Sequence, residues 1–153
     1  AETTGVALVM HGQSDERRRT HSSFDVQEDA FANRIRMSLI DAGIRDSHVR
    51  LCFHDWQSPD VTETVRHLAA VDCGNVIVAP VCFPLESSRT ILDLPIAVAQ
   101  ARVHEHVSTV ILPAWGEDDR IVEVLRDAVV RTAKDAGMPL GDMAVPGEAA
   151  TVR

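Results

Sequence analysis

The sequence lacks any long hydrophobic run and any excess of positive charge. No apolar stretch approaches the roughly 20 residues that a membrane-spanning helix needs, and residues 1–4 lack the basic and hydrophobic regions of a secretory signal. The 15 Lys and Arg residues are outnumbered by 23 Asp and Glu residues, which gives a formal net charge of -8. Such a charge opposes the capture of nucleic-acid phosphates or of anionic lipid surfaces. We therefore expect a cytoplasmic protein that binds neither nucleic acid nor membranes.

Cysteine is scarce, and the common nucleotide and hydrolase motifs are missing. The three cysteines are odd in number and show no CxxC spacing, which argues against a disulfide framework and against a structural zinc knuckle. They are predicted to be buried thiols, because a free cysteine behaves as a small hydrophobic residue. Neither GxGxxG nor GxxxxGK[ST] occurs, so a phosphate-binding loop is unsupported, and the absence of GxSxG argues against a hydrolase nucleophile elbow.

What remains is the composition of one soluble globular domain. Hydrophobic residues make up 45% of the chain and charged residues 25%. Four short apolar runs, rich in β-branched and aliphatic residues, alternate with longer amphipathic stretches. The runs are residues 6–10, 49–53, 75–81 and 108–112, and the amphipathic stretches are residues 24–42, 60–71, 88–102 and 119–136.

This alternation of strand and helix patterns predicts an α/β fold. Parallel strands need long crossover connections, and right-handed crossovers pack their helices back onto the sheet. We therefore predict a four-stranded parallel sheet with flavodoxin-like βα repeats and helices on both faces, within one domain at residues 1–137. Residues 138–153 contain prolines and glycines with little apolar periodicity, and they are predicted to be a loosely ordered tail.

A histidine that could act in catalysis or metal binding follows the first predicted strand. In a parallel sheet the carboxyl ends of the strands share one edge, and ligands bind just beyond them. His11 directly follows the first strand and precedes Gly12, a residue type that lets the backbone approach a ligand closely. An imidazole can accept a proton near neutral pH or bind a borderline divalent metal. We therefore predict His11 to be a catalytic residue and a metal ligand; the alternative is a histidine that caps a helix or only forms hydrogen bonds within the fold.

His54 and Asp55 end the second predicted strand side by side. Successive strand residues point to opposite faces, so only one of the two can share a wall with His11, and the pattern alone does not choose between them. Either side chain would complete a divalent-cation site opposite His11. The alternative is a surface carboxylate with a histidine packed under the following helix. Both residues are therefore candidate metal ligands.

Candidate substrate-binding residues follow the first and third strands. Arg89 can form bidentate hydrogen bonds with a carboxylate or phosphate, or it can pair instead with Glu86. A guanidinium there would oppose the binding of a metal dication beside His11. Arg17, in a short basic run, either begins a solvated helix or reaches ligand carboxylates. Ser14 and Glu86 complete the candidate substrate-binding set.

Four motifs, in order, resemble those of the class II chelatases, most closely the short sirohydrochlorin cobalt- and ferrochelatases and more distantly ferrochelatase. They are HGQSDER at 11–17, FHDWQSPD at 53–60, VIVAP at 76–80 with DLP at 93–95, and WGEDDR at 115–120. The resemblance spans nearly residues 6–130. It implies that His11 binds metal and handles pyrrole protons, and it places Asp55 at the acidic metal-binding position of the family.

The resemblance implies a chelatase, which is a lyase that inserts a divalent Co, Fe or Ni ion into a tetrapyrrole such as sirohydrochlorin, for cobalamin or siroheme biosynthesis. Arg89 and Arg17 would hold the peripheral carboxylates of the macrocycle. Short members of the family form a four-stranded parallel sheet and often dimerise or pair two such lobes. A homodimer or a second chelatase-like lobe is therefore expected.

One position departs from the family pattern. Four residues before the DLP motif, the sirohydrochlorin enzymes carry a second catalytic histidine and ferrochelatases carry a glutamate, whereas this chain has Arg89. A group that binds metal or takes protons is thus replaced by a permanent cation at a candidate catalytic position. Two alternatives to a chelatase follow: a repurposed enzyme that acts on a different anionic substrate, and a non-catalytic carrier of a metal or tetrapyrrole.

Overall fold

The structure of the chain, a computed structural model, describes residues 3–116 and 118–138. The chain divides into two compact units, Ala1–Gly116 and Glu117–Arg153. The predicted domain at residues 1–137 spans parts of both units, and the predicted tail lies outside the described residues apart from Met138. All four strands and all the candidate site residues belong to the first unit.

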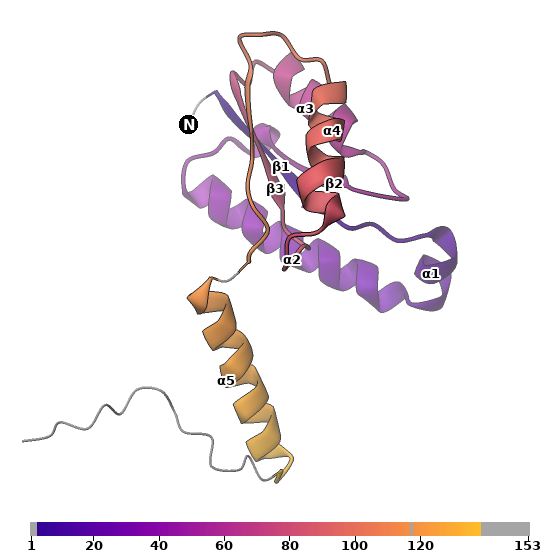
Figure 1. Cartoon of the computed structure of the whole chain (residues 1–153), viewed down its shortest axis with the longest axis vertical. Helices are drawn as coiled ribbons and strands as arrows, with labels where there is room; N and C mark the ends of the chain where they lie inside the picture. Colours follow the sequence, from indigo (N-terminus) through magenta and orange to yellow (C-terminus); the bar gives the residue numbers. More distant parts are fainter. Residues whose placement is uncertain (1–2, 117, 139–153) are drawn as a thin grey trace, which may run out of the picture. The chain divides into compact units, whose positions relative to one another are not determined.

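Four parallel strands form the sheet of the first unit. They are β1 (Thr4–Met10), β2 (Val49–Phe53), β3 (Asn75–Pro80) and β4 (Ser108–Ile111), in the spatial order β2-β1-β3-β4 (Figure 1). Strands of a parallel sheet that is covered on both faces are typically continuous apolar runs, and the central strands β1 and β3 fit that pattern. The edge strands depart from it, because β2 carries the exposed Arg50 and β4 alternates between exposed and half-buried residues. The predicted four-stranded parallel sheet is confirmed. Because β1 lies between β2 and β3, the segments that follow these three strands leave the sheet beside one another.

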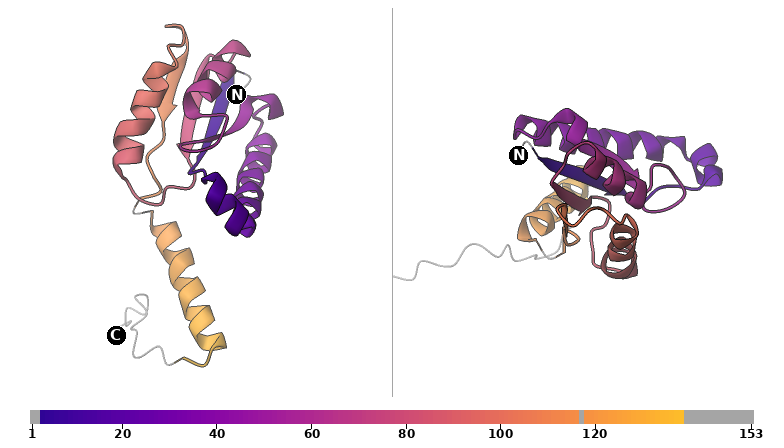
Figure 2. Two further views of the ribbon diagram at one scale, coloured as in Figure 1. Left: turned by 90° about the vertical axis from the view of Figure 1, so that its right-hand side faces the viewer. Right: turned by 90° about the horizontal axis from the view of Figure 1, so that it is seen from above.

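Helices connect the strands and cover the sheet (Figure 2). Between β1 and β2 lie α1 (Asp15–Thr20), α2 (Ser22–Asp41) and the short η1 turn (Asp46–His48). α3 (Val61–Ala70) joins β2 to β3, and the η2 turn (Arg89–Asp93) with α4 (Leu94–Gln100) joins β3 to β4. Among the described residues, no helix combines the length and the apolar character that crossing a membrane requires.

The two faces of β1 belong to two hydrophobic clusters, because side chains alternate along a strand. One cluster joins Leu8 and Met10 of β1 to Ala32 of α2. The other joins Val9 of β1 to residues of α3 and α4, among them the fully buried Leu68. Truncation of a side chain such as Leu68 to alanine would cost about 2–5 kcal/mol of stability. The predicted helices on both faces of the sheet are therefore confirmed.

The helical segments differ from the prediction in two places. Residues 15–20 form α1, and the predicted helix at 88–102 is divided into η2, which is a π-helical turn, and α4. Pro95 accounts for the division, because proline has no N–H and its ring crowds the carbonyl four residues earlier. The turn before it widens, so that the N–H of Leu94 reaches the carbonyl of Arg89. Such turns are frequent at functional sites, and this one begins with Arg89.

The second unit contains α5 (Asp119–Asp135). Asp118 caps its N-terminus by accepting hydrogen bonds from Nε of Arg120 at 2.9 Å and from the Arg120 backbone N–H at 3.0 Å. The side-chain bond, followed by the backbone bond, lowers the pKa of Asp118 to about 2. The cap explains why the helix begins at this point of the sequence.

Candidate functional site

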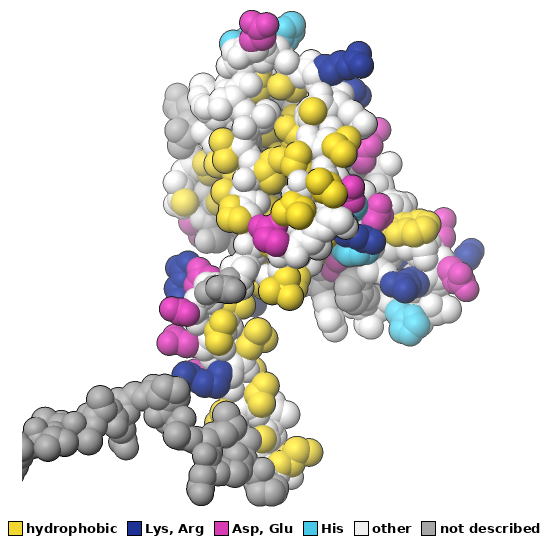
Figure 3. Space-filling view, viewed as in Figure 1, with side chains coloured by type: hydrophobic (Ala, Val, Ile, Leu, Met, Phe, Trp, Pro, Cys, Tyr) yellow, Lys and Arg dark blue, Asp and Glu magenta, His cyan; other side chains and the backbone are white. Residues whose placement is uncertain are grey.

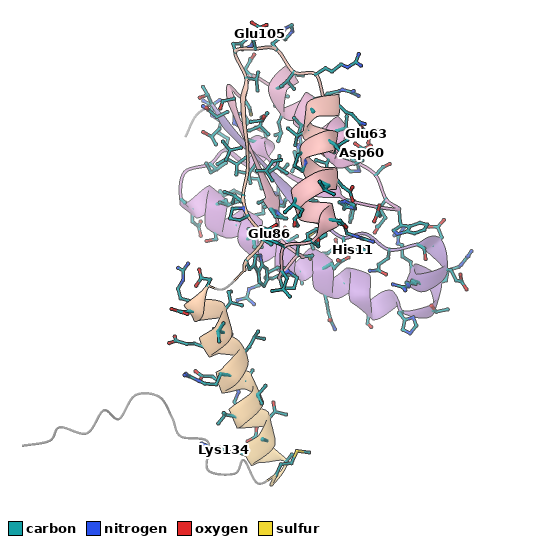
Figure 4. All side chains as sticks on the ribbon, viewed as in Figure 1. His11, Asp60, Glu63, Glu86, Glu105 and Lys134 are labelled. Carbon is teal, nitrogen blue, oxygen red and sulfur yellow. The ribbon has the colours of Figure 1, made fainter. Side chains whose placement is uncertain are left out.

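The chain segments after β1 and β2 remain paired beyond the strands themselves. The N–H of His54 donates to the Met10 carbonyl at 2.9 Å, and the N–H of Asp55 donates to the His11 carbonyl at 3.1 Å. The main chain therefore holds His11 beside Asp55, at the carboxyl edge of the sheet. Figure 4 labels His11 at this edge.

Gly12 permits this close approach. Its φ of +83° lies in the left-handed region, and a β-carbon there would stand 2.0 Å from the Asp55 carbonyl oxygen. The Gly12 carbonyl also accepts a hydrogen bond from Nδ1 of His11 at 2.9 Å. Since a carbonyl can only accept, Nδ1 carries a proton, and in the neutral ring Nε2 then carries the lone pair. His11 thus presents the nitrogen that can take a proton or bind a metal.

Arg89 joins His11 to Asp55. One guanidinium nitrogen, Nη1, donates to Nε2 of His11 and lies 2.9 Å from Oδ2 of Asp55. Because a guanidinium can only donate, this contact independently makes Nε2 of His11 the acceptor. The Arg89 and Asp55 side chains are 37% and 36% exposed, so the ion pair faces solvent. The sequence offered Glu86 as a partner within the protein, but the structure pairs Arg89 with Asp55, which follows β2 on the far side of β1.

His54 faces a different cavity from His11. Its side chain is 10% exposed, with Nδ1 3.1 Å from Oδ2 of Asp55 and Nε2 3.6 Å from Oδ2 of Asp93. Nδ1 nevertheless lacks an aligned hydrogen-bond partner among the described residues. His54 lines a cavity of about 330 Å³ together with Asp55 and Asp93. Arg89 connects Asp55 to His11, whereas the polar neighbours given for the His54 ring are the carboxylates of Asp55 and Asp93.

Phe83 lies between the two histidines. Its ring stacks on the imidazole of His11 with centroids 6.0 Å apart, and it meets the ring of His54 at 5.9 Å and an angle of 60°. Phe83 is buried and belongs to the core cluster beneath α3 and α4. The ring therefore supports the orientation of His11 from the core side. It stacks on the imidazole of His11 but meets that of His54 at an angle, so the two imidazoles pack differently against it.

A larger cavity of about 810 Å³ opens beside His11. Its wall is mostly apolar and includes the rings of Phe31 and Trp115, whose centroids lie 5.9 Å apart. Of the predicted site residues, His11 and Arg17 line it. The other lining residues are Gln13, His21, Glu28, Phe31, Val81, Cys82, Pro84 and Trp115. A cavity of this size and composition suits one organic ligand with an apolar body.

Sequence reasoning missed the acidic and aromatic parts of this wall. Glu28 on α2 is a carboxylate that is only 8% exposed. The available signal was its position four residues before Ala32 and seven before Ile35, on the apolar stripe of the helix. Burial, followed by the negative charge of Glu28, raises the pKa of Cys82 to about 11. The sequence indicated the place of Trp115 in the cavity wall less clearly, because Trp115 begins the WGEDDR motif but is not part of a helical or strand pattern.

Ser14 and Glu86 have partners within the protein. The hydroxyl of Ser14 accepts a hydrogen bond from the N–H of Arg17 at 3.4 Å and caps α1. The carboxylate of Glu86 accepts bonds from the Thr90 hydroxyl at 2.6 Å and from the Ala114 N–H at 2.9 Å, and these bonds lower its pKa. Glu86 thus ties the segment before η2 to the segment after β4. Contact of either residue with a substrate stays a prediction.

The residues that the structure describes form only part of a metal site. Among them, no group of three or more His, Cys, Asp or Glu side chains is arranged to hold a metal ion. His11 and Asp55 are two potential ligands, and Nη1 of Arg89 contacts both. A dication about 4 Å from a guanidinium would meet a repulsion of about 8 kcal/mol at an effective dielectric of about 20. A dication at this position would therefore have to displace the guanidinium of Arg89.

The chain resembles known proteins over most of its length. A family model described as CbiX matches residues 5–132. The crystal structure of a CbiX protein from Marinobacter aquaeolei VT8, whose description proposes a role in cobalamin (vitamin B12) biosynthesis, matches with a TM-score of 0.63. The two chains are 16% identical, and the match covers 88% of this chain and 98% of that one, which shows a shared fold. No curated protein matches.

The family match confirms the resemblance to the class II chelatases that the four motifs indicated. It covers the four strands almost completely, together with the carboxyl edge at which His11, Asp55 and Arg89 meet. Since residues 5–132 are well over half of the sequence, the chain belongs to the CbiX family.

Proposed function

We propose that this chain is a chelatase, a lyase that inserts a divalent metal ion into an anionic tetrapyrrole, with sirohydrochlorin as the favoured substrate. Membership of the CbiX family supports chelation as the class of reaction. The observation that carries the proposal is the position of His11, which presents a proton-accepting nitrogen beside an apolar cavity large enough for a macrocycle. Co, Fe and Ni are the candidate metals, and each is a substrate of the reaction. The proposed place of action is the cytoplasm.

Each residue at the carboxyl edge has a task in this proposal. Insertion of a dication displaces two pyrrole protons; Nε2 of His11 accepts one of them once Arg89 has left it, and the other passes to solvent. The carboxylate of Asp55 supplies a negatively charged oxygen to the incoming dication. Arg17 at the cavity wall and Arg89 pair with the peripheral carboxylates of the macrocycle, for which a guanidinium is well shaped.

The wall of the large cavity suits the body of the same ligand. Phe31 and Trp115 present aromatic rings to a planar conjugated system, and such ring pairs contribute about 0.5–1.5 kcal/mol beyond the burial of area. Glu28 lines the same wall, and its carboxylate would repel a peripheral carboxylate of the ligand. The bound macrocycle is therefore expected to turn its carboxylates towards Arg17 and away from Glu28.

The outer surface of η2 and α4 supports the expected homodimer. Ile91, Leu92 and Ile96 are exposed there, and Figure 3 shows hydrophobic side chains gathered over this part of the first unit. Exposed apolar patches on soluble proteins commonly mark contact surfaces. A second copy that covers this patch would stand next to Arg89, which begins η2. Analytical ultracentrifugation of the wild type and of Ile96→Lys tests the dimer.

The ion pair of Arg89 supports the two competing functions. A permanent cation contacts the atoms that would face a metal, which fits an enzyme that acts on another anionic ligand, or a carrier that holds its ligand without turnover. Both alternatives predict binding of an anionic ligand without metal insertion. A measurement of insertion therefore separates them from the chelatase.

The experiment is an anaerobic absorbance assay with sirohydrochlorin and Co²⁺, Ni²⁺ or Fe²⁺ in turn. We expect the wild type to exceed the spontaneous insertion rate with at least one metal, and His11→Ala to lose about 100-fold, a usual contribution of a general base. His106→Ala is the matched control, because His106 is exposed and precedes β4, at the opposite edge of the sheet. Insertion at the spontaneous rate with all three metals would overturn the chelatase, and stoichiometric binding without turnover would then support a carrier.

A further inference from the structure

We propose that Arg89 is a gate that keeps the metal position closed until an anionic macrocycle binds, so that the tetrapyrrole enters before the metal. The inference rests on the proposed function and adds its order of binding. It starts from one atom, Nη1 of Arg89, which contacts both Nε2 of His11 and Oδ2 of Asp55. These are the two protein atoms that a metal ion would approach. A guanidinium of the chain itself thus takes the position of the dication.

In the closed position both ring nitrogens of His11 and the carboxylate of Asp55 have partners. His11 donates through Nδ1 to the Gly12 carbonyl and accepts from Arg89 through Nε2. Asp55 has the guanidinium at 2.9 Å and the imidazole of His54 at 3.1 Å. A metal ion that arrives alone must break the contacts of Arg89 and then bind beside a displaced cation. The wild-type protein is therefore expected to hold the metal alone only weakly.

The side chain of Arg89 can leave this position without disturbing the core. Its backbone is fixed, because its carbonyl accepts the N–H of Leu94 in the widened η2 turn. Hydrogen bonds among Glu86, Ser87 and Thr90 hold the segment on either side of it. The side chain itself is 37% exposed. A rotation of the guanidinium towards solvent or ligand thus breaks its contacts with His11 and Asp55, while the backbone bonds of η2 stay in place.

The chemistry that would open the gate is a carboxylate at the edge of a macrocycle. A guanidinium binds carboxylates in a bidentate manner, so it can exchange the carboxylate of Asp55 for one of the ligand. That exchange frees Nε2 of His11 and Oδ2 of Asp55 together. The ligand then supplies the pyrrole nitrogens, which the protein needs because no three side chains of its described part can hold a metal by themselves. Opening of the gate and completion of the metal site are thus the same event.

The closed state is tested by measuring the affinity of the protein for Co²⁺ by titration calorimetry, in the absence of tetrapyrrole and therefore without turnover. The wild type is compared with Arg89→Ala, with Arg89→Gln, and with the double variant Arg89→Ala, His11→Ala. We expect each single variant to bind Co²⁺ about tenfold or more tightly than the wild type, because loss of the cation frees His11 and Asp55. The double variant should lose this gain. Circular dichroism and thermal melts establish that each variant is folded. Two substitutions are made at position 89 so that the test still stands if one of the variants does not fold.

A copper-loaded octacarboxylate porphyrin tests the opening. Its ring already holds a metal, so additional Co²⁺ binding reports the ligands of the protein, after subtraction of a His11→Ala blank. With this porphyrin bound, the wild type should approach the Co²⁺ affinity of Arg89→Ala, whereas that variant should change by less than about twofold. A copper porphyrin with uncharged glycol side chains is the matched control, and it should leave the wild type unchanged.

Three results would overturn the gate. The first is equal Co²⁺ affinity in the wild type and both Arg89 variants, and the second is a gain that survives in the double variant. The third is a wild type whose Co²⁺ affinity falls or stays constant when the carboxylate porphyrin binds. None of these results decides whether the wild type inserts metal into sirohydrochlorin. The gate can therefore fail while insertion proceeds, and insertion can fail while the gate is confirmed.

Discussion

Gly12 and Asp55 approach each other so closely through the main chain that a β-carbon on Gly12 would stand 2.0 Å from the Asp55 carbonyl oxygen. Gly12→Ala is therefore expected to force His11 and Asp55 apart. The positive φ costs an alanine about 1–2 kcal/mol, and displacement of packed backbone adds about 1–3 kcal/mol. We expect the free energy of unfolding, measured by urea denaturation, to fall by about 2–5 kcal/mol.

Gly43→Ala is the matched control for this substitution. Gly43 also has a positive φ, of +96°, but nothing lies within 4 Å of the β-carbon that alanine would add. Gly43→Ala should therefore lower the free energy of unfolding by only the cost of a positive φ at alanine, about 1–2 kcal/mol. Equal losses in the two variants would show that the contact with Asp55 is not the reason for glycine at position 12.

The aromatic wall of the large cavity is expected to contribute to the binding of an octacarboxylate porphyrin. Trp115→Ala removes one ring of the Phe31–Trp115 pair, and it should weaken binding about tenfold through lost aromatic contact and buried area. Trp56→Ala is the control, because Trp56 is 72% exposed and lies outside the lining of that cavity. An absorbance titration in which both substitutions had the same effect would place the porphyrin elsewhere.

Glu86 is expected to make the stability of the first unit depend on pH. The hydrogen bond from Thr90, followed by that from Ala114, holds the pKa of Glu86 below its ordinary value of 4.5. A carboxyl group with a lowered pKa in the folded state stabilises the fold above its ordinary pKa, and that contribution is lost as the pH falls through the lowered value. We expect Glu86→Gln to melt below the wild type at neutral pH, with a gap that shrinks as the pH falls below 4.5. A gap that stays constant from neutral to acidic pH would contradict this role.

Cys82 is expected to react slowly with thiol reagents, and a ligand in the large cavity should slow it further. Its pKa is raised to about 11, so only about one thiol in a thousand is ionised at pH 8. Cys52 should react more slowly still, because burial raises its pKa to about 12 and its side chain is fully buried. Iodoacetamide labelling followed by mass spectrometry gives the two rates. Rapid labelling of Cys82 at neutral pH, or a rate that porphyrin leaves unchanged, would contradict its place in the cavity wall.

The sheet and the edge that carries the site could be predicted, because both follow from local patterns. Apolar runs of strand length are visible in the sequence, and the length of the connections favours parallel pairing. Parallel strands end at one edge, so His11 and Asp55 could be expected near each other before any coordinates. The same reasoning kept His54 as an alternative, because alternation along a strand separates neighbours without saying which neighbour faces which wall.

The contacts of Arg89 could not be predicted from local patterns, and for Glu28 the apolar stripe of α2 opposes the usual preference of a carboxylate for solvent. Arg89 begins the π-helical turn before Pro95, and its guanidinium meets Asp55 from a strand end two strands away, a pairing that appears only in the folded chain. Glu28 runs against the usual expectation that a charged residue on a helix faces solvent. Its burial depends on the neighbouring wall of the cavity, which is assembled from segments distant in the sequence.

The pairing of the chain after β1 with the chain after β2 also bears on how such an edge can diversify. Adjacent strands lie about 4.8 Å apart, so the separation of the main-chain points that carry side chains 11 and 55 is set by the sheet. Mutation can exchange the side chain at position 11 or 55 while the main-chain hydrogen bonds that hold the position stay in place. Arg89 is attached to a turn, where an insertion or deletion of one residue would redirect its side chain. Changes in chain length within η2 are therefore the simplest route by which members of this fold could acquire different chemistry at an unchanged scaffold.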